Sequence, residues 1–116
     1  MSKARKRAVE EVFSALGDGT RLSLVRKLGA AGALSATTLS EGAKVSRQAI
    51  VKHLRVLEGA GLVTPERRGR EVLYALETKR LTDARGFLDE VSARWDRALE
   101  RLRRQVEEPA RGERES

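Results

Sequence analysis

The side chains best suited to chemistry in this sequence are cations and hydrogen-bond donors, gathered between residues 44 and 70. This stretch holds seven lysines and arginines against two glutamates, an excess of five positive charges. The whole chain has a formal net charge of +7 at pH 7. Such a charge favours a polyanionic partner, because lysine and arginine neutralise phosphates and release their condensed counterions. The pattern therefore predicts binding to nucleic acid, with an acidic protein surface or an anionic membrane as alternatives.

No set of residues in the sequence predicts catalysis or metal binding. The chain has no cysteine, which excludes disulfides, thiolate metal sites and thiol redox chemistry. Its one histidine, His53, falls in a predicted helix, where packing or bonding within the fold is the expected role. There is no glycine-rich phosphate loop, and adjacent carboxylates such as Asp89 and Glu90 point in different directions on a helix. We therefore predict no enzyme activity, no cofactor and no metal site.

A helix from Ser46 to about Glu58 positions much of the positive charge. Ser46 is a favourable N-cap, and the apolar residues that follow form one stripe suited to packing: Ala49, Ile50, Leu54 and Leu57. The side chains outside this stripe suit base edges and phosphates: Arg47, Gln48, Val51, Lys52 and Arg55. Arg47 could pair with guanine, Gln48 with adenine, and Val51 could touch a thymine methyl. The alternative is an ordinary amphipathic surface helix.

The segments on either side of this helix extend the cationic surface. Before it, Gly42 to Val45 form a predicted turn that carries Lys44. After it, strands are predicted over Leu62–Glu66 and Glu71–Leu76. The connection between the strands is a hairpin tip crowded with cations: Arg67, Arg68, Gly69 and Arg70. Because like charges repel and add nothing to a turn, the arginines predict contact with phosphates, whereas protection of an edge strand is the alternative.

Three helices precede this region. The first is predicted over Ala4–Leu16, and the second over Thr20–Leu28, with Asp18 as its N-cap and an apolar face that includes Leu22. Residues 29–32 form a predicted flexible break, and a short third helix begins at Ser35 or Ala36. The predicted fold class is mainly α with a small β-hairpin, a winged helix-turn-helix with a long C-terminal dimerisation helix.

The last helix carries an apolar stripe with a period close to 3.5 residues between Leu81 and Val106. Such a stripe is too long to bury against one small domain, so part of it should pack on the first helix and part on a two-fold partner. The predicted dimer interface comprises Val9, Val12, Phe13, Leu81, Leu88, Val91, Trp95, Leu99 and Leu102. A membrane-surface helix is the alternative, opposed by the acidic residues of the same helix.

The sequence predicts one functional domain and a short tail. Residues 1–108 form the predicted DNA-binding and dimerisation domain, and residues 109–116 a charged, disordered tail that begins at a proline. No apolar run approaches the length of a membrane-spanning helix, and the basic N-terminal stretch precedes no signal-type segment. We therefore predict a cytoplasmic protein.

Several segments resemble the ArsR-type winged helix-turn-helix regulators. Ala15–Arg21 is similar to the family's Leu-Ala/Gly-Asp-Pro-Thr-Arg segment, and Ser46–Leu57 to its recognition helix. The exit over Glu58–Val63 and the Arg-Gly-Arg wing continue the resemblance. It implies a homodimer that binds an inverted repeat in double-stranded DNA, blocks transcription, and pairs its subunits through the first and last helices.

The departures from this family pattern are also informative. Gly19 stands where the family usually has proline, which should loosen the start of the second helix slightly. The thiol pair of the metal-sensing branch would fall at Ser35 and Thr37, and the last helix has no histidine. The resemblance therefore implies a branch that lacks the metal-sensing residues.

These observations predict a sequence-specific regulator of transcription, a homodimeric repressor that binds an inverted-repeat operator without a metal switch. Two other hypotheses are a weakly specific architectural (chromatin-like) DNA-binding protein and a protein-interaction module that has lost DNA binding. For the releasing signal we consider a small apolar effector near Phe13, Phe87 or Trp95 at the dimer seam, a sequestering protein, or no effector.

Overall fold

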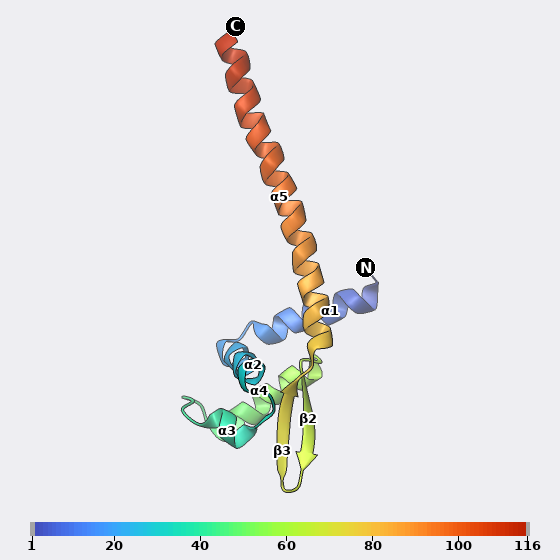
Figure 1. Cartoon of the computed structure of the whole chain (residues 1–116), viewed down its shortest axis with the longest axis vertical. Coiled ribbons are helices and arrows are strands. Elements are labelled where there is room, and N and C mark those ends of the chain that lie inside the picture. The colour runs from blue at the N-terminus through green and yellow to red at the C-terminus, as the bar shows by residue number, and fades with distance from the viewer. Residues whose placement is uncertain (1, 116) are drawn as a thin grey trace. The chain divides into compact units, whose positions relative to one another are not determined.

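A computed structural model describes the backbone of residues 2–115 and the side chains of residues 2–107. The chain divides into two compact units, residues 1–84 and 85–116. The elements follow in the order α1 (Lys3–Leu16), α2 (Gly19–Ala31), β1 (Leu34–Ser35), α3 (Ala36–Ser40), α4 (Arg47–Gly59), β2 (Val63–Arg68), β3 (Glu71–Leu76) and α5 (Thr78–Glu115) (Figure 1). The predicted fold class, mainly helical with a small hairpin and a long last helix, is confirmed.

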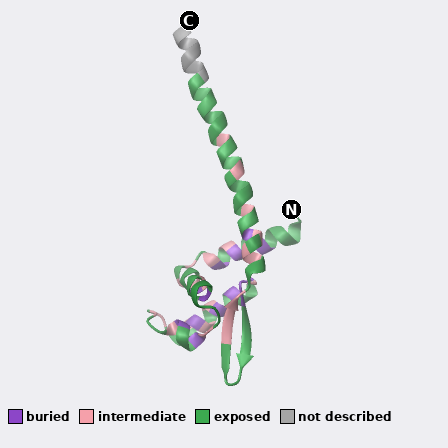
Figure 2. Ribbon diagram, in the orientation of Figure 1, coloured by how far each residue is buried: buried purple, intermediate pink, exposed green. Residues whose placement is uncertain are grey.

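The core of the first unit is made of aliphatic side chains from α1 to α4, the strands and the start of α5. Val12, Leu24, Leu39 and Leu54 are among its fully buried members, and Ala84 marks its end in the chain. Figure 2 shows buried residues along the helices of this unit, while the outer half of the β2–β3 hairpin is exposed. Within the described residues no charged or polar side chain is buried. Apolar burial is therefore the main stabilising contribution of this core.

Both ends of α4 are set by local hydrogen bonds. At its start, the side chain of Ser46 accepts a hydrogen bond from the amide of Ala49 at 3.1 Å, as its predicted capping role requires. At its end, the amides of Gly61 and Leu62 donate to carbonyls of the last turn at 2.9 Å each, in a Schellman arrangement. Gly61 has φ +75°, and a Cβ there would meet Arg80 at 2.9 Å. Glycine at this position therefore turns the chain sharply from α4 into β2.

The strands form a small antiparallel sheet in the order β1-β3-β2. Because β2 lies at the edge, Pro65 is tolerated within it. The strand β2 runs further than predicted, to Arg68, so Arg67 and Arg68 belong to the strand and only Gly69 and Arg70 form the loop. Gly69 has φ +62°, which a two-residue hairpin loop with glycine in its first position requires. This longer strand corrects the predicted four-residue tip.

Other boundaries also differ from the sequence predictions. The predicted break over residues 29–32 is wrong, because α2 continues through Ala31 and ends at Gly32, where φ is +84°. Alanine favours helix, and the left-handed glycine stops it. Leu22, assigned to the inner face of this helix, is exposed. The two-residue strand β1, which pairs with β3 at Leu34 and Ser35, was not predicted because it is too short to show alternation.

The second unit consists of α5 from Arg85 onward. Its larger apolar side chains are mostly exposed: Leu88, Val91, Trp95, Leu99, Leu102 and Val106. The backbone is helical to Glu115, and the tail predicted over residues 109–116 lies outside the residues whose side chains are described. That residues 1–108 act as one functional domain stays a prediction. No helix in the described part of the chain is long and apolar enough to cross a membrane.

The packing of α4 yields a first prediction. Leu54→Ala should lower the free energy of unfolding by about 2–5 kcal/mol, because it leaves a cavity in the core. Chemical denaturation at fixed protein concentration measures this change. Val56→Ala, two residues away on the same helix and 45% exposed, is the matched control and should change it by less than about 0.5 kcal/mol. Equal losses in the two variants would contradict this assignment of the buried face.

Candidate nucleic-acid interface

The helix α4 has one buried and one exposed face. Ile50, Leu54 and Leu57 are buried, and Ala49 is half-buried. The four polar side chains assigned to DNA contact are all exposed: Arg47, Gln48, Lys52 and Arg55. Val56 and Glu58 are also exposed, nearer the end of the helix. Val51 differs, because it is half-buried and packs against the core, so that only part of its surface is free for a base methyl. The helix therefore offers three cations and one amide to a ligand outside the fold.

Arg47 is held by a neighbour that the sequence did not identify. Its Nε donates a hydrogen bond to Thr37 Oγ1, on α3, at 3.0 Å. The two Nη groups of the guanidinium take no part in this bond. The sequence does place a hydroxyl residue, Thr37, in the helix before α4. Spacing alone does not show that its side chain contacts an arginine ten residues later.

Lys44 and Ser46 lie in the segment that leads into α4. Both residues are exposed. The side chain of Ser46 is used as the N-cap. The first amides of an α-helix have no carbonyl partner within the helix and point out of its start along the axis. Lys44 adds a cation two residues before the cap. This end of α4 can therefore attract a phosphate through charge and amide groups together.

The arginines of the hairpin are distributed differently from the prediction. Because successive residues of a strand point to opposite faces, Arg67 and Arg68 project from different sides of β2. Arg68 Nε lies 3.6 Å from Glu66 Oε1 in an exposed ion pair, which partly offsets its charge. Arg70 lies in the loop beyond the strands. The hairpin thus presents cations on both faces and at its tip.

A polar cluster ties α4 to the start of α2. Arg21 Nη1 lies 3.3 Å from His53 Nδ1, and Asp18 Oδ1 lies 3.9 Å from the same ring nitrogen. Arg21 Nε also donates to the carbonyl of Ala15 at 2.6 Å, which satisfies an end carbonyl of α1. His53 therefore bonds within the fold, as its position in the sequence suggested.

Asp18 is the N-cap of α2, and its ionisation is shifted. Its Oδ1 accepts a hydrogen bond from the backbone amide of Arg21 at 3.0 Å. That bond, followed by the charges of Arg21 and His53, holds the pKa of Asp18 below its ordinary value of 3.8, against the opposing effect of desolvation. The ionised carboxylate is therefore the form that the fold favours.

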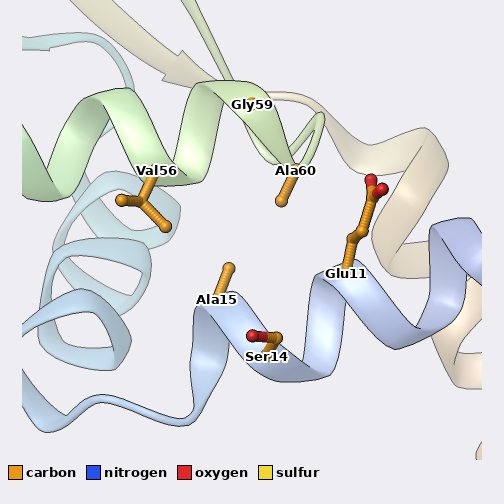
Figure 3. Close-up of a pocket in the computed structure, with 6 residues that line it drawn as sticks. All are labelled: Glu11, Ser14, Ala15, Val56, Gly59 and Ala60. Atoms are coloured by element: carbon orange, nitrogen blue, oxygen red, sulfur yellow. The ribbon is translucent and has the colours of Figure 1, made fainter.

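A cavity of about 230 Å³ lies between α1 and α4. Figure 3 shows its lining: Glu11, Ser14 and Ala15 on α1, Val56 and Gly59 on α4, and Ala60 at the C-cap of α4. These side chains are small or apolar apart from one carboxylate and one hydroxyl, and none is cationic. The cavity is therefore unsuited to a phosphate. In the described part of the chain, no three His, Cys, Asp or Glu residues gather as a metal site would require.

The residues assigned to the dimer interface fall into two groups. Val9 and Val12 are buried in the single chain, and their place in a dimer interface stays a prediction. Phe13 and Leu81 are half-buried and pack against the core. The remaining five are exposed on α5: Leu88, Val91, Trp95, Leu99 and Leu102. Periodicity alone could not separate a helix face that meets its own core from one that is free.

The three-helix arrangement of α2 to α4, followed by a hairpin with basic side chains, defines a winged helix-turn-helix protein. A family model described as a helix-turn-helix domain matches residues 16–66. The chain is 38% identical over 93 residues to the HTH-type transcriptional regulator Rv2034 of Mycobacterium tuberculosis, covering 80% of this chain and 83% of that protein. It is 30% identical over 76 residues to the transcriptional repressor SdpR of Bacillus subtilis, covering 66% and 83% respectively.

Solved structures agree with this class. An ArsR-like transcriptional regulator from Rhodococcus sp. RHA1 has a TM-score of 0.71 and 38% sequence identity, with coverage of 84% of this chain and 91% of that one. HlyU from Vibrio cholerae has the same fold, with a TM-score of 0.62 at 23% identity over 78% of this chain and 94% of that one. The chain belongs to the ArsR family of winged helix-turn-helix transcriptional regulators.

The capping carboxylate yields a prediction about pH. Since the folded-state pKa of Asp18 is lowered, its charge stabilises the fold above the ordinary pKa, and this contribution is lost as pH falls through the folded value. In Asp18→Asn the amide oxygen can still cap α2, but the charge is absent. Urea unfolding should show the variant less stable than the parent at neutral pH, with the difference shrinking in strong acid. A difference that is constant with pH would contradict the assigned role of the charge.

Proposed function

We propose that this protein is a homodimeric repressor that binds an inverted-repeat operator in double-stranded DNA and needs no metal to do so. The observation that carries the proposal is the exposed polar face of α4, whose opposite face is fixed in the core. The chain has the helix-turn-helix architecture in which this helix enters the major groove. Steric occlusion of a promoter by the bound dimer would then repress transcription.

Within this proposal α4 reads bases and its surroundings hold the backbone. Arg47 and Gln48 lie in the first turn, the part of a recognition helix that reaches base edges. Arg47 would donate to guanine and Gln48 would bond adenine, while Lys52 and Arg55 are further along the exposed face. Lys44 and the amides at the start of α4 would hold a phosphate. In this proposal the first turn of α4 determines sequence specificity, and the phosphate contacts around it contribute affinity for any DNA sequence.

The hairpin is the proposed wing. Arg67, Arg68 and Arg70 would contact the DNA backbone or the adjacent minor groove. Glu66 competes for Arg68 in the free protein, so Arg70, at the exposed loop, is the cation whose role is simplest to test. Contacts of this kind carry no base information and depend strongly on salt.

The exposed stripe on α5 supports a dimer. Trp95 is 62% exposed, and Leu88, Val91, Leu99 and Leu102 recur with it at three- and four-residue spacing. A row of large apolar side chains on the surface of a single chain is an expected site of protein association. To read two half-sites in successive major grooves, the paired subunits would have to present their two copies of α4 about 34 Å apart, one helical turn of DNA. The inverted repeat of the proposed operator follows from this symmetry.

Ser35 and Thr37, at the positions of the metal-sensing thiol pair, support the proposal that this protein has no metal switch. Ser35 caps α3, because its Oγ accepts a hydrogen bond from the amide of Thr38 at 3.1 Å. Thr37 holds Arg47. Both positions therefore have structural roles that use hydroxyl oxygen, a poor ligand for the soft metals that thiolates select.

Base reading yields a third prediction. After selection of a bound sequence from a random duplex pool, Gln48→Ala should weaken binding to that sequence by about 1–3 kcal/mol and spare random DNA, because a contact to a base is lost. Fluorescence anisotropy titrations measure both affinities. Gln105→Ala removes an exposed amide from α5 and is the matched control, which should leave both affinities unchanged.

A variant of the wing, the β2–β3 hairpin, provides the comparison with Gln48→Ala. Arg70→Gln should weaken binding to both DNAs alike and reduce the slope of log affinity against log salt by about 0.9. Failure of the selection to enrich any sequence would contradict specific recognition and favour the architectural alternative. An equal loss of affinity on both DNAs in Gln48→Ala would count against base reading by α4.

The stripe on α5 yields a fourth prediction. Leu99→Glu should convert the dimer to a monomer and weaken operator binding, because it places a charge within the proposed apolar seam. Sedimentation velocity measures the mass in solution. Gly86→Glu adds the same charge at an exposed position on the face of α5 opposite the stripe, where an added Cβ meets nothing within 4 Å, and should leave the dimer intact. A Leu99→Glu protein that sediments as a dimer would rule out this stripe as the interface.

A further inference from the structure

A second cavity, of about 280 Å³, lies between α2 and the turn that leads into α4. It belongs wholly to the first unit and is distinct from the cavity between α1 and α4. The residues that line it come from α2, from the turn and from α4. Its volume is near the lower end of the range for small-molecule sites, about 300–1,000 Å³.

The lining separates an apolar part from a cationic part. Leu24 and Ile50 are buried members of the core, and Ala43 and Val45 pack against it. Lys27 and Lys44 are exposed, one on α2 and the other on the turn, so two positive charges reach the cavity from different elements. The sequence assigned only Lys44 to a function, and Lys27 to none.

Hydrogen-bonding groups complete the lining, and no acidic residue belongs to it. Thr20 and Ser23 bring two hydroxyl groups from α2. The carboxylates nearest in sequence are Asp18 and Glu41, next to two lining glycines. Asp18 is bonded to the amide of Arg21 and lies near His53. An anion in the cavity would therefore meet two cations and two hydroxyls without a lining carboxylate to repel it.

We propose that this cavity binds a small organic anion, a carboxylate carried on a compact apolar body. The carboxylate would lie between Lys27 and Lys44 and accept from the hydroxyls, and the apolar body would cover Leu24, Ala43, Val45 and Ile50. An inorganic anion would use the cations but leave the apolar lining in water, and an uncharged apolar molecule would leave the lysines without a counter-charge. Only a ligand with both parts satisfies the whole lining.

A ligand bound in this cavity would affect the proposed DNA interface. The turn that carries Lys44 leads directly to the cap of α4, and Ile50 belongs to α4 itself. A carboxylate bound to Lys44 takes that cation away from a DNA phosphate, so ligand and operator oppose each other. This regulatory consequence rests on the proposed function, whereas binding of the anion to the DNA-free protein does not.

The test begins with the DNA-free protein and three probes at constant ionic strength. Benzoate has both the charge and the apolar body, acetate has only the charge, and benzyl alcohol has only the apolar body. Amide chemical shifts in NMR titrations should change saturably with benzoate at Ser23, Gly42 and Lys44. Acetate and benzyl alcohol should bind about tenfold more weakly or worse, since each loses one class of contact.

Variants then locate the site. Lys27→Gln should weaken benzoate binding about tenfold, because it removes a charged partner from an exposed position without touching the core. Lys6→Gln, at an exposed lysine of α1 outside the lining, is the matched control and should bind benzoate as the parent does. On the selected operator, saturating benzoate should lower the affinity of the parent about fivefold or more, and that of Lys27→Gln much less.

Several results would overturn the proposal. These are the absence of saturable shifts with benzoate, equal binding of benzoate by the parent and Lys27→Gln, and phosphate binding as tight as benzoate binding, which would indicate a site for inorganic anions. Loss of DNA affinity in Lys27→Gln without any benzoate binding would assign the lysine to the DNA interface instead. Because benzoate binding is measured without DNA, failure to select an operator would contradict the proposed function and leave this test intact.

Discussion

The burial of one face of α4 is the constraint on which the rest of this structure depends. Ile50, Leu54 and Leu57 are almost wholly removed from water, and rotation of the helix would expose them while burying arginine and lysine. The penalty for burying an unpaired cation is much larger than any single base contact provides. The hydrophobic effect, which has no preference for any DNA sequence, thus determines which side chains are available for recognition.

Hydrogen bonds and ion pairs then fix the ends of α4 and its orientation relative to α2. Ser46 and Gly61 determine where α4 begins and ends, and the Asp18–Arg21–His53 cluster links its middle to the start of α2. These polar groups lie at the edge of the core, where water can still reach them, and within the described residues none is buried. A division of this kind allows the core to supply stability while its polar rim sets orientation.

The sequence was most informative where a physical signal is local. The caps at Asp18 and Ser46, the apolar stripe of α4 and the long last helix could all be predicted from neighbouring residues. Contacts between distant segments could not: the pairing of β1 with β3, the partners of His53, and the burial of Val9 and Val12 each depend on how helices meet. Periodicity identifies an apolar face but not what covers it. The candidate interface was therefore predicted better in its residue types than in its geometry.

The hydrogen bond between Arg47 and Thr37 has a consequence for the thermodynamics of recognition. A long side chain that is free in solution loses conformational entropy when a ligand immobilises it, which costs about 1.5–2 kcal/mol for arginine. Because Thr37 already restrains the guanidinium, part of this entropy is lost during folding and not during association. A threonine hydroxyl that never meets a base would then strengthen binding by pre-organising the arginine that does.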